Sequence, residues 1–258
     1  ARQGRLTVAS SSLITNGFPT YAGGERGFGG GLYALDAVLT LSDVRFDRNS
    51  MNAYDNTTGG ALYTLRGTQT VLNCRFERNY VRDANGNAAI LVLDTPISAL
   101  VSNCVVENNR GYAYYNPAVI DTRGTAGGVV GFEDCVIRNN RMTAQIAGYL
   151  PSAVRIRSSS GAVLLRHCEV VGNDGAGIYR VNGTAPLALT NCLIAGNGVD
   201  GVCLASAGNL SLANCTIAHN AGGLGVTNNG AGTVTVRDSI FWGNGGGGCA
   251  GNNLNVTY

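Results

Sequence analysis

The sequence predicts an all-β fold, a single-stranded right-handed parallel β-helix of about nine coils with three short strands in each coil. Two observations predict it. A seven-residue pattern that closes with asparagine recurs nine times, and apolar residues alternate with polar or small ones before most copies. The closing residues are Asn16, Asn49, Asn79, Asn109, Asn140, Asn173, Asn197, Asn220 and Asn244. They follow one another at 33, 30, 30, 31 and 33 residues, and then at 24, 23 and 24 residues.

The alternation before and within the pattern indicates strands. Residues 187–190 read Leu-Ala-Leu-Thr, which is the period of a half-buried strand, and no segment shows helical spacing with caps. Alternation resumes within the pattern after a corner, and residues 60–63 exemplify a third short strand before the next turn. A propeller blade needs about 40 residues and a leucine-rich repeat carries a helix, so neither fits the shorter repeats.

The coils fill the chain from end to end, so residues 1–258 are predicted to form one domain. Residues 1–151 are expected to form coils with long loops, and residues 152–258 coils with short loops. The chain enters in a strand at residues 5–8 and stops in one at residues 254–258, without the polar caps that solenoids need. We therefore expect a fragment of a longer polypeptide, whose other parts would hold a secretion signal and an anchor.

Charge and hydropathy narrow the possible partners. All 18 basic residues are arginines and the net charge is only +2. No basic stripe with interleaved aromatic residues is visible along the sequence, so nucleic acid is not an expected partner. No apolar run approaches 18 residues, so no membrane span is expected within this segment.

Six of the eight cysteines share one position of the pattern and are expected to stack inside the coils. They are Cys74, Cys104, Cys135, Cys168, Cys192 and Cys215. Strands about 4.8 Å apart would bring neighbouring cysteines within the Cα range of a disulfide. Their side chains leave the backbone in parallel, however, and cysteine behaves well as a small buried hydrophobe. We expect free thiols, and no metal, because a column does not converge as a tetrahedral site must.

The closing asparagines are predicted to form a structural ladder, with Asn79, Asn109, Asn140, Asn173, Asn197 and Asn220 as its central members. Asparagine tolerates the left-handed conformation that a corner demands, and stacked amides can donate to one another. A second corner column holds Asn73, Asn103 and Asn191, among others. His167 stands in this second column and is expected to substitute in the ladder rather than act as a catalytic base.

Five inserts in the first coils are expected to be loops that stack as a wall along one edge of the first sheet. They cover residues 17–29, 50–58, 80–87, 110–117 and 141–151. With outward residues of the first sheet, their tyrosines suggest a shallow groove for an extended polysaccharide. The candidate ligand-binding residues are Tyr33, Tyr54, Tyr63, Tyr112, Tyr114, Tyr115 and Tyr149. The alternative is that these tyrosines pack the inserts onto the rod, and the two interpretations are compatible.

Catalytic candidates are fewer. Glycoside hydrolysis needs two carboxylates on a common face, and the first sheet offers Asp121, with Asp36 and Asp94 at strand ends in other coils. In a lyase, Arg155 or Arg157, both expected to face outward, could take the proton and Asp121 could bind a metal ion. Carboxylates for a second and third ligand are missing, so no cofactor is expected, with calcium as the alternative.

Some motifs resemble those of known repeat proteins. The segments FDRN (residues 46–49) and FERN (residues 76–79), with GGGLY (residues 29–33) and GGALY (residues 59–63), resemble the paired GGA and FxxN motifs of polymorphic outer membrane protein repeats. The segment IFWGN (residues 240–244) is similar to the closing coil of bacterial right-handed parallel β-helix proteins that end in a surface-anchoring segment. The likeness extends over the whole chain and to pectate-lyase-like β-helices.

The resemblance implies a bacterial protein outside the cell, secreted or associated with the outer membrane or cell wall. Such coils carry adhesins, autotransporter passengers, pectate lyases and polysaccharide hydrolases. We therefore expect a non-catalytic β-helix module, working as an adhesin, a stalk or a carbohydrate-contacting passenger domain, whose partner is a polysaccharide or another cell-surface molecule. The alternative is a polysaccharide lyase or glycoside hydrolase with a groove along the first sheet, and a purely structural rod is the third hypothesis.

Overall fold

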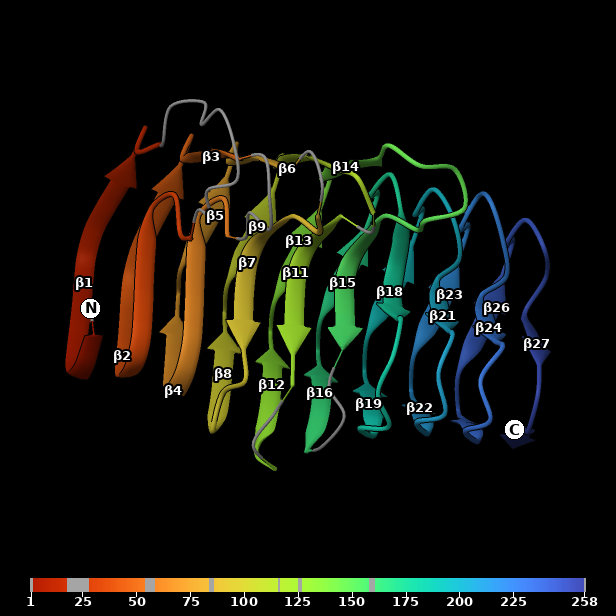
Figure 1. Cartoon of the computed structure of the whole chain (residues 1–258). Helices are drawn as coiled ribbons and strands as arrows, with labels where there is room; N and C mark the ends of the chain where they lie inside the picture. Colours follow the sequence, from red (N-terminus) through yellow and green to blue (C-terminus); the bar gives the residue numbers. More distant parts are fainter. Residues whose placement is uncertain are drawn as a thin grey trace.

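The computed structural model describes residues 2–17, 28–53, 59–83, 86–115, 117–124, 127–157 and 161–257. Over these ranges the chain forms strands and turns but no helix, and its coils stack along one axis as a parallel β-helix (Figure 1). The prediction of an all-β solenoid is confirmed. Among the same residues, no helix is long and apolar enough to cross a membrane.

Each coil passes through three faces, named A, B and C in chain order, and face A is the first sheet of the sequence prediction. Face A holds β7 (Ala89–Asp94), β11 (Ala118–Arg123), β15 (Ser152–Arg157), β18 (Ala176–Arg180), β21 (Val202–Leu204), β24 (Val226–Asn228) and β27 (Cys249–Gly251). Face B holds β8 (Ser98–Ser102), β12 (Val129–Glu133), β16 (Ala162–Arg166), β19 (Leu187–Thr190), β22 (Leu210–Ala213), β25 (Val234–Arg237) and β28 (Leu254–Thr257). Face C holds β5 (Arg75–Glu77), β9 (Val105–Glu107), β13 (Val136–Arg138), β17 (Glu169–Val171), β20 (Leu193–Ala195), β23 (Thr216–Ala218) and β26 (Ile240–Trp242).

Three long strands in the first coils bend through corners and belong to more than one face. They are β1 (Arg2–Ile14), β2 (Leu32–Asp47) and β4 (Leu62–Leu72). Because they are continuous, hydrogen bonds join all three faces into one 24-stranded sheet. Every strand pair in it is parallel, so equivalent residues of consecutive coils lie beside one another, as the repeat predicts.

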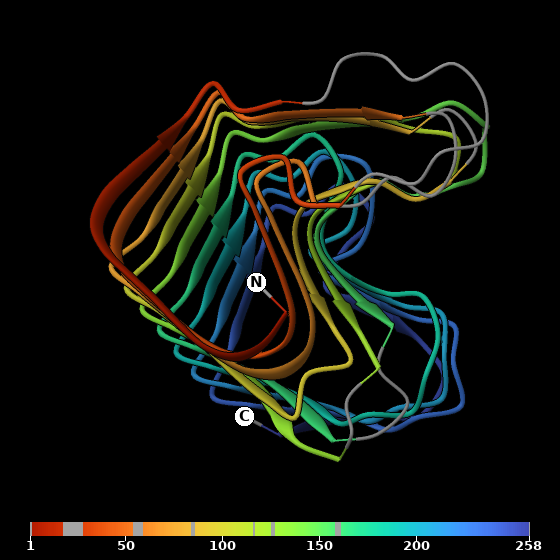
Figure 2. The same ribbon diagram turned by 60° about the vertical axis from the view of Figure 1, so that its left-hand side comes forward.

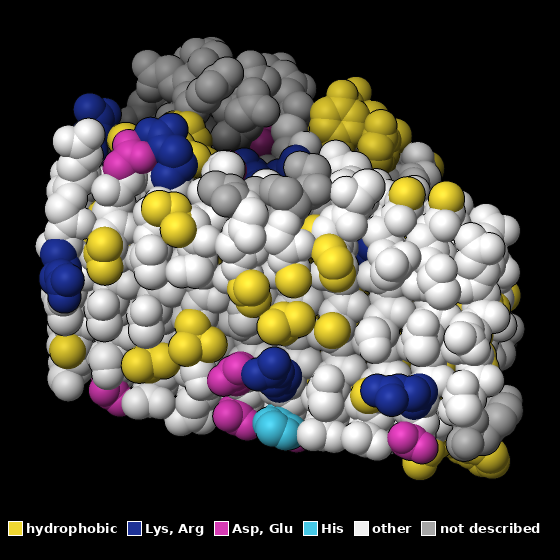
Figure 3. All heavy atoms as spheres, turned by 90° about the horizontal axis from the view of Figure 1, so that it is seen from below, with side chains coloured by type: hydrophobic (Ala, Val, Ile, Leu, Met, Phe, Trp, Pro, Cys, Tyr) yellow, Lys and Arg dark blue, Asp and Glu magenta, His cyan; other side chains and the backbone are white. Residues whose placement is uncertain are grey.

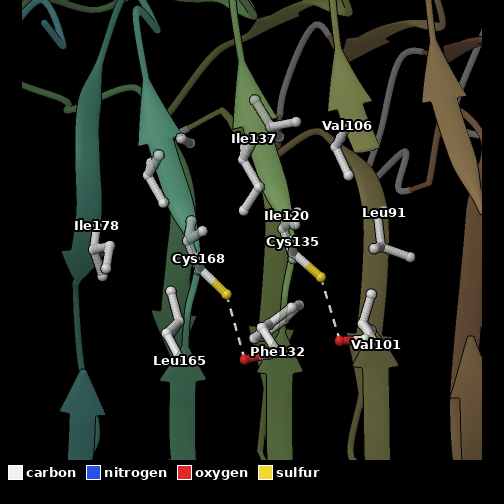
Figure 4. Packing of buried hydrophobic residues seen from close by; sticks show 14 of the residues in the cluster. Leu91, Val101, Val106, Ile120, Phe132, Cys135, Ile137, Leu165, Cys168 and Ile178 are labelled. Carbon is white, nitrogen blue, oxygen red and sulfur yellow. Dashed lines mark hydrogen bonds between the residues drawn. The ribbon is translucent and has the colours of Figure 1, made fainter. Parts of the chain in front are cut away.

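Inward columns form the core. On face A, Leu91 pairs with Ile120, Ile120 with Val154 and Val154 with Ile178, and at most 1% of each residue is exposed. The six stacked cysteines are buried and free, which confirms the prediction of thiols. Cys135 and Cys168 donate their Sγ–H groups to carbonyl oxygens of the preceding coil, Val101 at 3.3 Å and Phe132 at 3.4 Å (Figure 4).

The ladder of closing asparagines is confirmed by hydrogen bonds from Asn16 through to Asn244. Asn109 shows the pattern. Its backbone N–H and its Nδ2 both donate to Oδ1 of Asn140, at 3.0 and 2.9 Å, and Nδ2 also donates to the carbonyl of Phe76 at 2.9 Å. A buried primary amide can make four such bonds, so each ladder residue between two others uses its full capacity.

The second corner column also forms as predicted. Asn103, His167 and Asn191 adopt positive φ values of 51°, 51° and 53°, the left-handed conformation of a tight corner. Nδ2 of Asn191 lies 3.0 Å from Nε2 of His167, so the histidine replaces an amide in this ladder. These side chains are exposed, whereas the closing asparagines from Asn49 to Asn220 are buried.

Four of the five inserts begin with a strand, so the prediction of simple loops is wrong for them. These strands form a separate parallel sheet, the arm sheet: β3 (Ser50–Ala53), β6 (Tyr80–Asp83), β10 (Arg110–Ala113) and β14 (Arg141–Ala144). In every coil the residue after the ladder asparagine bonds to the preceding ladder asparagine, as Arg110 N–H does to the Asn79 carbonyl at 2.9 Å, and in these inserts the parallel pairing continues for three more residues. The first insert lies mostly outside the described residues.

We call the segments that begin with the strands of the arm sheet the arms. They project from the stacked coils and then return to face A (Figure 2). The returning chain passes close under the arm strand, since a Cβ at Gly60 would lie 2.7 Å from the backbone oxygen of Tyr80. Only glycine permits this approach. Between residues 161 and 257, all of which are described, turns follow the ladder asparagine and no arm strand forms.

Candidate functional site

The outward column of face A gathers most of the residues singled out from the sequence. In register, it runs through Tyr33, Tyr63, Val92, Asp121, Arg155 and Tyr179. The expectation that Tyr63 and Arg155 line an open face is wrong, because Tyr63 is 3% and Arg155 0% exposed. A second, small apolar cluster explains the burial of Tyr63. It joins Tyr63, Ala89, Val92 and Ala118, with Phe28, Tyr33 and Leu65 packed against it.

Asp121 lies at the centre of an ion cluster on this face. Arg155 binds it in a bidentate manner, with Nε 2.9 Å from Oδ1 and Nη2 2.8 Å from Oδ2. Arg157 Nη2 and Arg123 Nε lie 2.6 and 2.7 Å from Oδ2. The register places them together, because β11 pairs Asp121 with Arg155 of β15 and Arg123 with Arg157. Three guanidinium groups therefore share one buried carboxylate.

The charges of this cluster determine the protonation state of Asp121. Burial by itself would raise the pKa of Asp121, but the charges of Arg155, Arg157 and Arg123 outweigh it and hold the pKa well below its ordinary value. Burial lowers the pKa of Arg155, against the opposing effect of Asp121. At neutral pH Asp121 is thus an ionised acceptor whose oxygens are occupied by guanidinium groups. This arrangement does not suit the metal-ligand role that Asp121 would have in the lyase alternative, nor does the buried Arg155 suit that of a base.

Arg123 connects this cluster to the neighbouring coil. Its Nη1 lies 3.4 Å from Oδ2 of Asp94, and its Cζ lies 6.0 Å from the ring centre of Tyr63. The hydroxyl of Tyr63 donates to the same Asp94 oxygen at 2.8 Å. Burial raises the pKa of Tyr63, so this hydroxyl keeps its proton. The two carboxylates that the sequence placed in separate coils, Asp94 and Asp121, are therefore joined by one arginine.

A pocket of about 320 Å³ opens beside the cluster. Its lining residues are Asn87, Tyr115, Tyr149, Arg157, Val181 and Asn182. The rings of Tyr115 and Tyr149 meet edge to face, with centres 5.0 Å apart, and Tyr114 packs against Tyr115 at 4.9 Å. Nη1 of Arg155 donates to Oδ1 of Asn87 at 3.2 Å, which ties the pocket wall to the ion cluster.

The arms position these tyrosines through further coil-to-coil bonds. Beyond the arm strands, Tyr114 N–H bonds to the Asp83 carbonyl at 3.1 Å, and Ile146 N–H bonds to the Tyr114 carbonyl at 3.3 Å. Tyr149 remains 40% exposed, and the side chain of Arg157 is 23% exposed. The pocket therefore offers two aromatic rings and the partly exposed guanidinium of Arg157, which is one of three guanidinium groups that surround the two carboxylates of the cluster.

The other tyrosine candidates lie elsewhere. Tyr33 stacks against Phe28 and meets Tyr63 at a tilt, each with ring centres 5.5 Å apart, so these rings pack the returning chain onto face A. Tyr112 lies on the arm sheet with Arg82 Cζ 5.9 Å above its ring. Tyr54 lies outside the described residues.

Sequence reasoning missed Asn87, Val181 and Asn182. Asn87 lies in the chain that returns from an arm, and the other two lie in the turn after β18. Only the register of face A could have indicated them, because irregular segments carry no periodic signal.

A family model described as a right handed beta helix region matches the chain twice, over residues 26–188 and 119–257. Together the two matches include every coil from residue 26 onward. No curated protein and no solved structure matches the chain.

Proposed function

Because the chain belongs to the right-handed β-helix family, we propose that it is a non-catalytic module that binds an extended acidic polysaccharide. The binding site is the pocket between the arms and face A. The observation that carries the proposal is the convergence of Tyr115, Tyr149 and the accessible guanidinium of Arg157 in one pocket.

The pocket chemistry suits a sugar acid. Tyrosine rings present an apolar body and a polar hydroxyl, which matches a sugar ring with its alternating C–H and O–H groups. Nε and Nη2 of Arg157 already bind Asp121, at 3.3 and 2.6 Å, and the remaining N–H groups of its guanidinium can donate to a sugar carboxylate. A few converging polar groups in a largely preformed hollow are typical of a binding site.

The carboxylates argue for binding rather than hydrolysis. A glycoside hydrolase needs one carboxyl group that keeps a proton and a second that is ionised. Asp121 cannot supply the proton, because its pKa lies well below the ordinary value. Asp94 and Asp121 both engage Arg123, so neither is free to approach a glycosidic bond. We place the module at a bacterial surface or in the secreted fraction, as an adhesin, stalk or passenger domain.

The test combines a glycan array with calorimetry on the best-scoring acidic glycan. We expect the Tyr115→Ala/Tyr149→Ala variant to bind that glycan about tenfold more weakly, because both aromatic contacts are lost. Trp242→Ala is the matched control, since Trp242 is an exposed aromatic residue, 69% exposed, on face C. Equal affinities of the pocket variant and the control would remove this pocket from consideration.

The same samples decide between binding and catalysis. Incubation of the wild-type protein with the bound glycan should release no unsaturated or shortened fragments, as followed by ultraviolet absorbance and by reducing ends. Fragments that disappear in an Arg157→Gln variant would replace the binding module by a polysaccharide lyase.

A further inference from the structure

The outward face of the arm sheet is strongly basic. Tyr80, Arg110 and Arg141 occupy one column of β6, β10 and β14, and all three side chains are exposed. Arg82 is exposed in the next outward column, over the ring of Tyr112. By contrast, charged side chains are scattered over the face of the molecule seen in Figure 3 and form no continuous stripe there.

Two adjoining hollows run along the base of this face. The first, of about 350 Å³, is lined by Arg78, Asn79, Tyr80, Asn108 and Arg110. The second, of about 280 Å³, is lined by Asn108, Asn109, Arg110, Asn139, Arg141, Gly172 and Asp174. Because they share Asn108 and Arg110, they form one groove that crosses successive coils parallel to the axis. We call it the basic groove.

The charge of the basic groove is unbalanced. Arg78, Arg110 and Arg141 line it, and Asp174 is the one carboxylate among the lining residues of the two hollows. Asp174 pairs with Arg141 at 3.0 Å, but their side chains are 51% and 69% exposed, so water and salt screen the pair. Arg78 also pairs with Asp47 and with Glu77, which do not line the hollows, yet 41% of its side chain remains exposed.

We propose that the basic groove binds an acidic polysaccharide, whose anionic groups lie against Arg110 and Arg141 on successive coils. Guanidinium groups on neighbouring rungs repeat at about 4.8 Å, so the groove suits a polymer with regularly spaced charges. The amides of Asn108 and Asn139 supply donors and acceptors for sugar hydroxyl groups. The groove shares no lining residue with the pocket of Tyr115 and Tyr149, so this inference does not depend on that pocket.

The aromatic residues favour a polysaccharide over single-stranded nucleic acid. Proteins that bind single strands stack successive bases on a series of exposed rings. Here Tyr80 is the one aromatic residue among the lining residues, and Arg82 already covers a face of the nearby Tyr112. The arginines of the basic groove lie one coil apart along the chain, so they form no basic stripe in the sequence. That absence was therefore no argument against a polyanion.

The first experiment removes two charges from the groove. The variant is Arg110→Gln/Arg141→Gln, and its matched control is Arg166→Gln/Arg237→Gln, which removes two exposed arginines from face B. Arg166 pairs with Glu133 across one coil, as Arg141 does with Asp174. Dissociation constants are measured for polygalacturonate, heparin and an oligothymidylate at two salt concentrations, after thermal unfolding has shown that both variants are folded.

We expect the wild-type protein to bind one of the two glycans more tightly than the oligothymidylate. The groove variant should bind that glycan about five- to tenfold more weakly and with a smaller salt dependence, while the control changes by less than about twofold. Equal losses in variant and control, or no glycan binding at low salt, would overturn the proposal. Tighter binding of the oligothymidylate would assign the groove to nucleic acid instead.

A second variant tests whether removing a negative charge from the groove tightens glycan binding. Asp174→Asn removes the negative charge from the groove and should tighten glycan binding by about twofold, most clearly at low salt. A purely structural role of these residues predicts no such gain. Unchanged or weaker binding by Asp174→Asn would contradict the proposed path of the polymer. The pocket variant Tyr115→Ala/Tyr149→Ala should keep the salt-dependent component, which separates the two sites.

Discussion

The coils that carry an arm, here called the armed coils, and the coils without one, the bare coils, share one scaffold. They differ in the segment after the ladder asparagine. After Asn49, Asn79, Asn109 and Asn140 an arm strand forms, whereas turns come after Asn173, Asn197, Asn220 and Asn244. In the armed part of face A the outward column holds Asp121 and Arg155 at 0% exposure. In the bare part the same column continues as Tyr179, Cys203 and Thr227. The scaffold is thus constant, and the buried ion cluster of Asp121 and the pocket of Tyr115 and Tyr149 form where the arms return to face A.

The largest expected effect tests whether the scaffold is the same in both regions. Asn140→Ala and Asn197→Ala each remove a buried amide that donates two and accepts two hydrogen bonds. Each should lower the free energy of unfolding by about 3–5 kcal/mol, because buried partners are left unsatisfied. Urea unfolding measures both. Costs that differ by more than about 2 kcal/mol would show that the ladder is not equivalent in the two regions.

The next effect is specific to the armed coils. Asp121→Asn leaves Arg123, Arg155 and Arg157 without their shared counter-charge and should cost about 2–4 kcal/mol at neutral pH. The folded-state pKa of Asp121 lies well below 3.8, so its contribution is complete above about pH 4 and is lost as the pH falls through the folded-state pKa. Urea unfolding of both proteins between pH 2 and 7 should show the gap narrowing only at the acid end. A constant gap would contradict the ion cluster.

The bare coils contain a buried arginine that, unlike Arg155, has no carboxylate among its described hydrogen-bond partners. Arg180 is 0% exposed, donates through Nη2 to the Asn209 carbonyl at 3.0 Å, and has no described hydrogen-bond partner at Nε or Nη1. Burial lowers its pKa to about 10. Arg180→Met should therefore stabilise the fold by about 1–2 kcal/mol, whereas Arg155→Met should destabilise it by leaving Asp121 with less counter-charge. Thermal and urea unfolding of both variants would show the opposite signs, and equal signs would refute the distinction.

The smallest effect concerns the exposed corner column. Asn103→Ala removes the bond from its Nδ2 to Oδ1 of Asn73 at 2.9 Å, and both side chains are exposed. The cost should be about 1 kcal/mol or less, because water replaces the lost partner. A value near that of Asn140→Ala, measured by the same urea titration, would mean that the two ladders are equally important.

The periodic parts of the molecule could be predicted from the sequence. The closing asparagines and the cysteine column repeat once per coil, and a parallel register converts each repeat into a column in space. The register also pairs Asp121 with Arg155. Their mutual neutralisation could have been predicted by counting along the strands, but a search for catalytic groups treated the two residues separately.

The features that could not be predicted from the sequence lie in segments that have no repeating residue pattern. The arm strands were missed because four residues, as in Ser50–Ala53, show too little alternation to indicate a strand. The burial of Tyr63 depends on how the returning chain packs onto face A, and the pocket depends on a turn at Val181 and Asn182. The basic groove combines Arg78, Arg110 and Arg141, which the stacking of successive coils brings together.

Hydrogen–deuterium exchange with and without a saturating acidic glycan tests most directly whether the arms and the adjoining part of face A bind the ligand. We predict slower exchange of backbone amides in residues 110–115 and 145–157, and unchanged exchange in residues 187–257. Protection confined to residues 187–257, with the armed coils unchanged, would contradict this account.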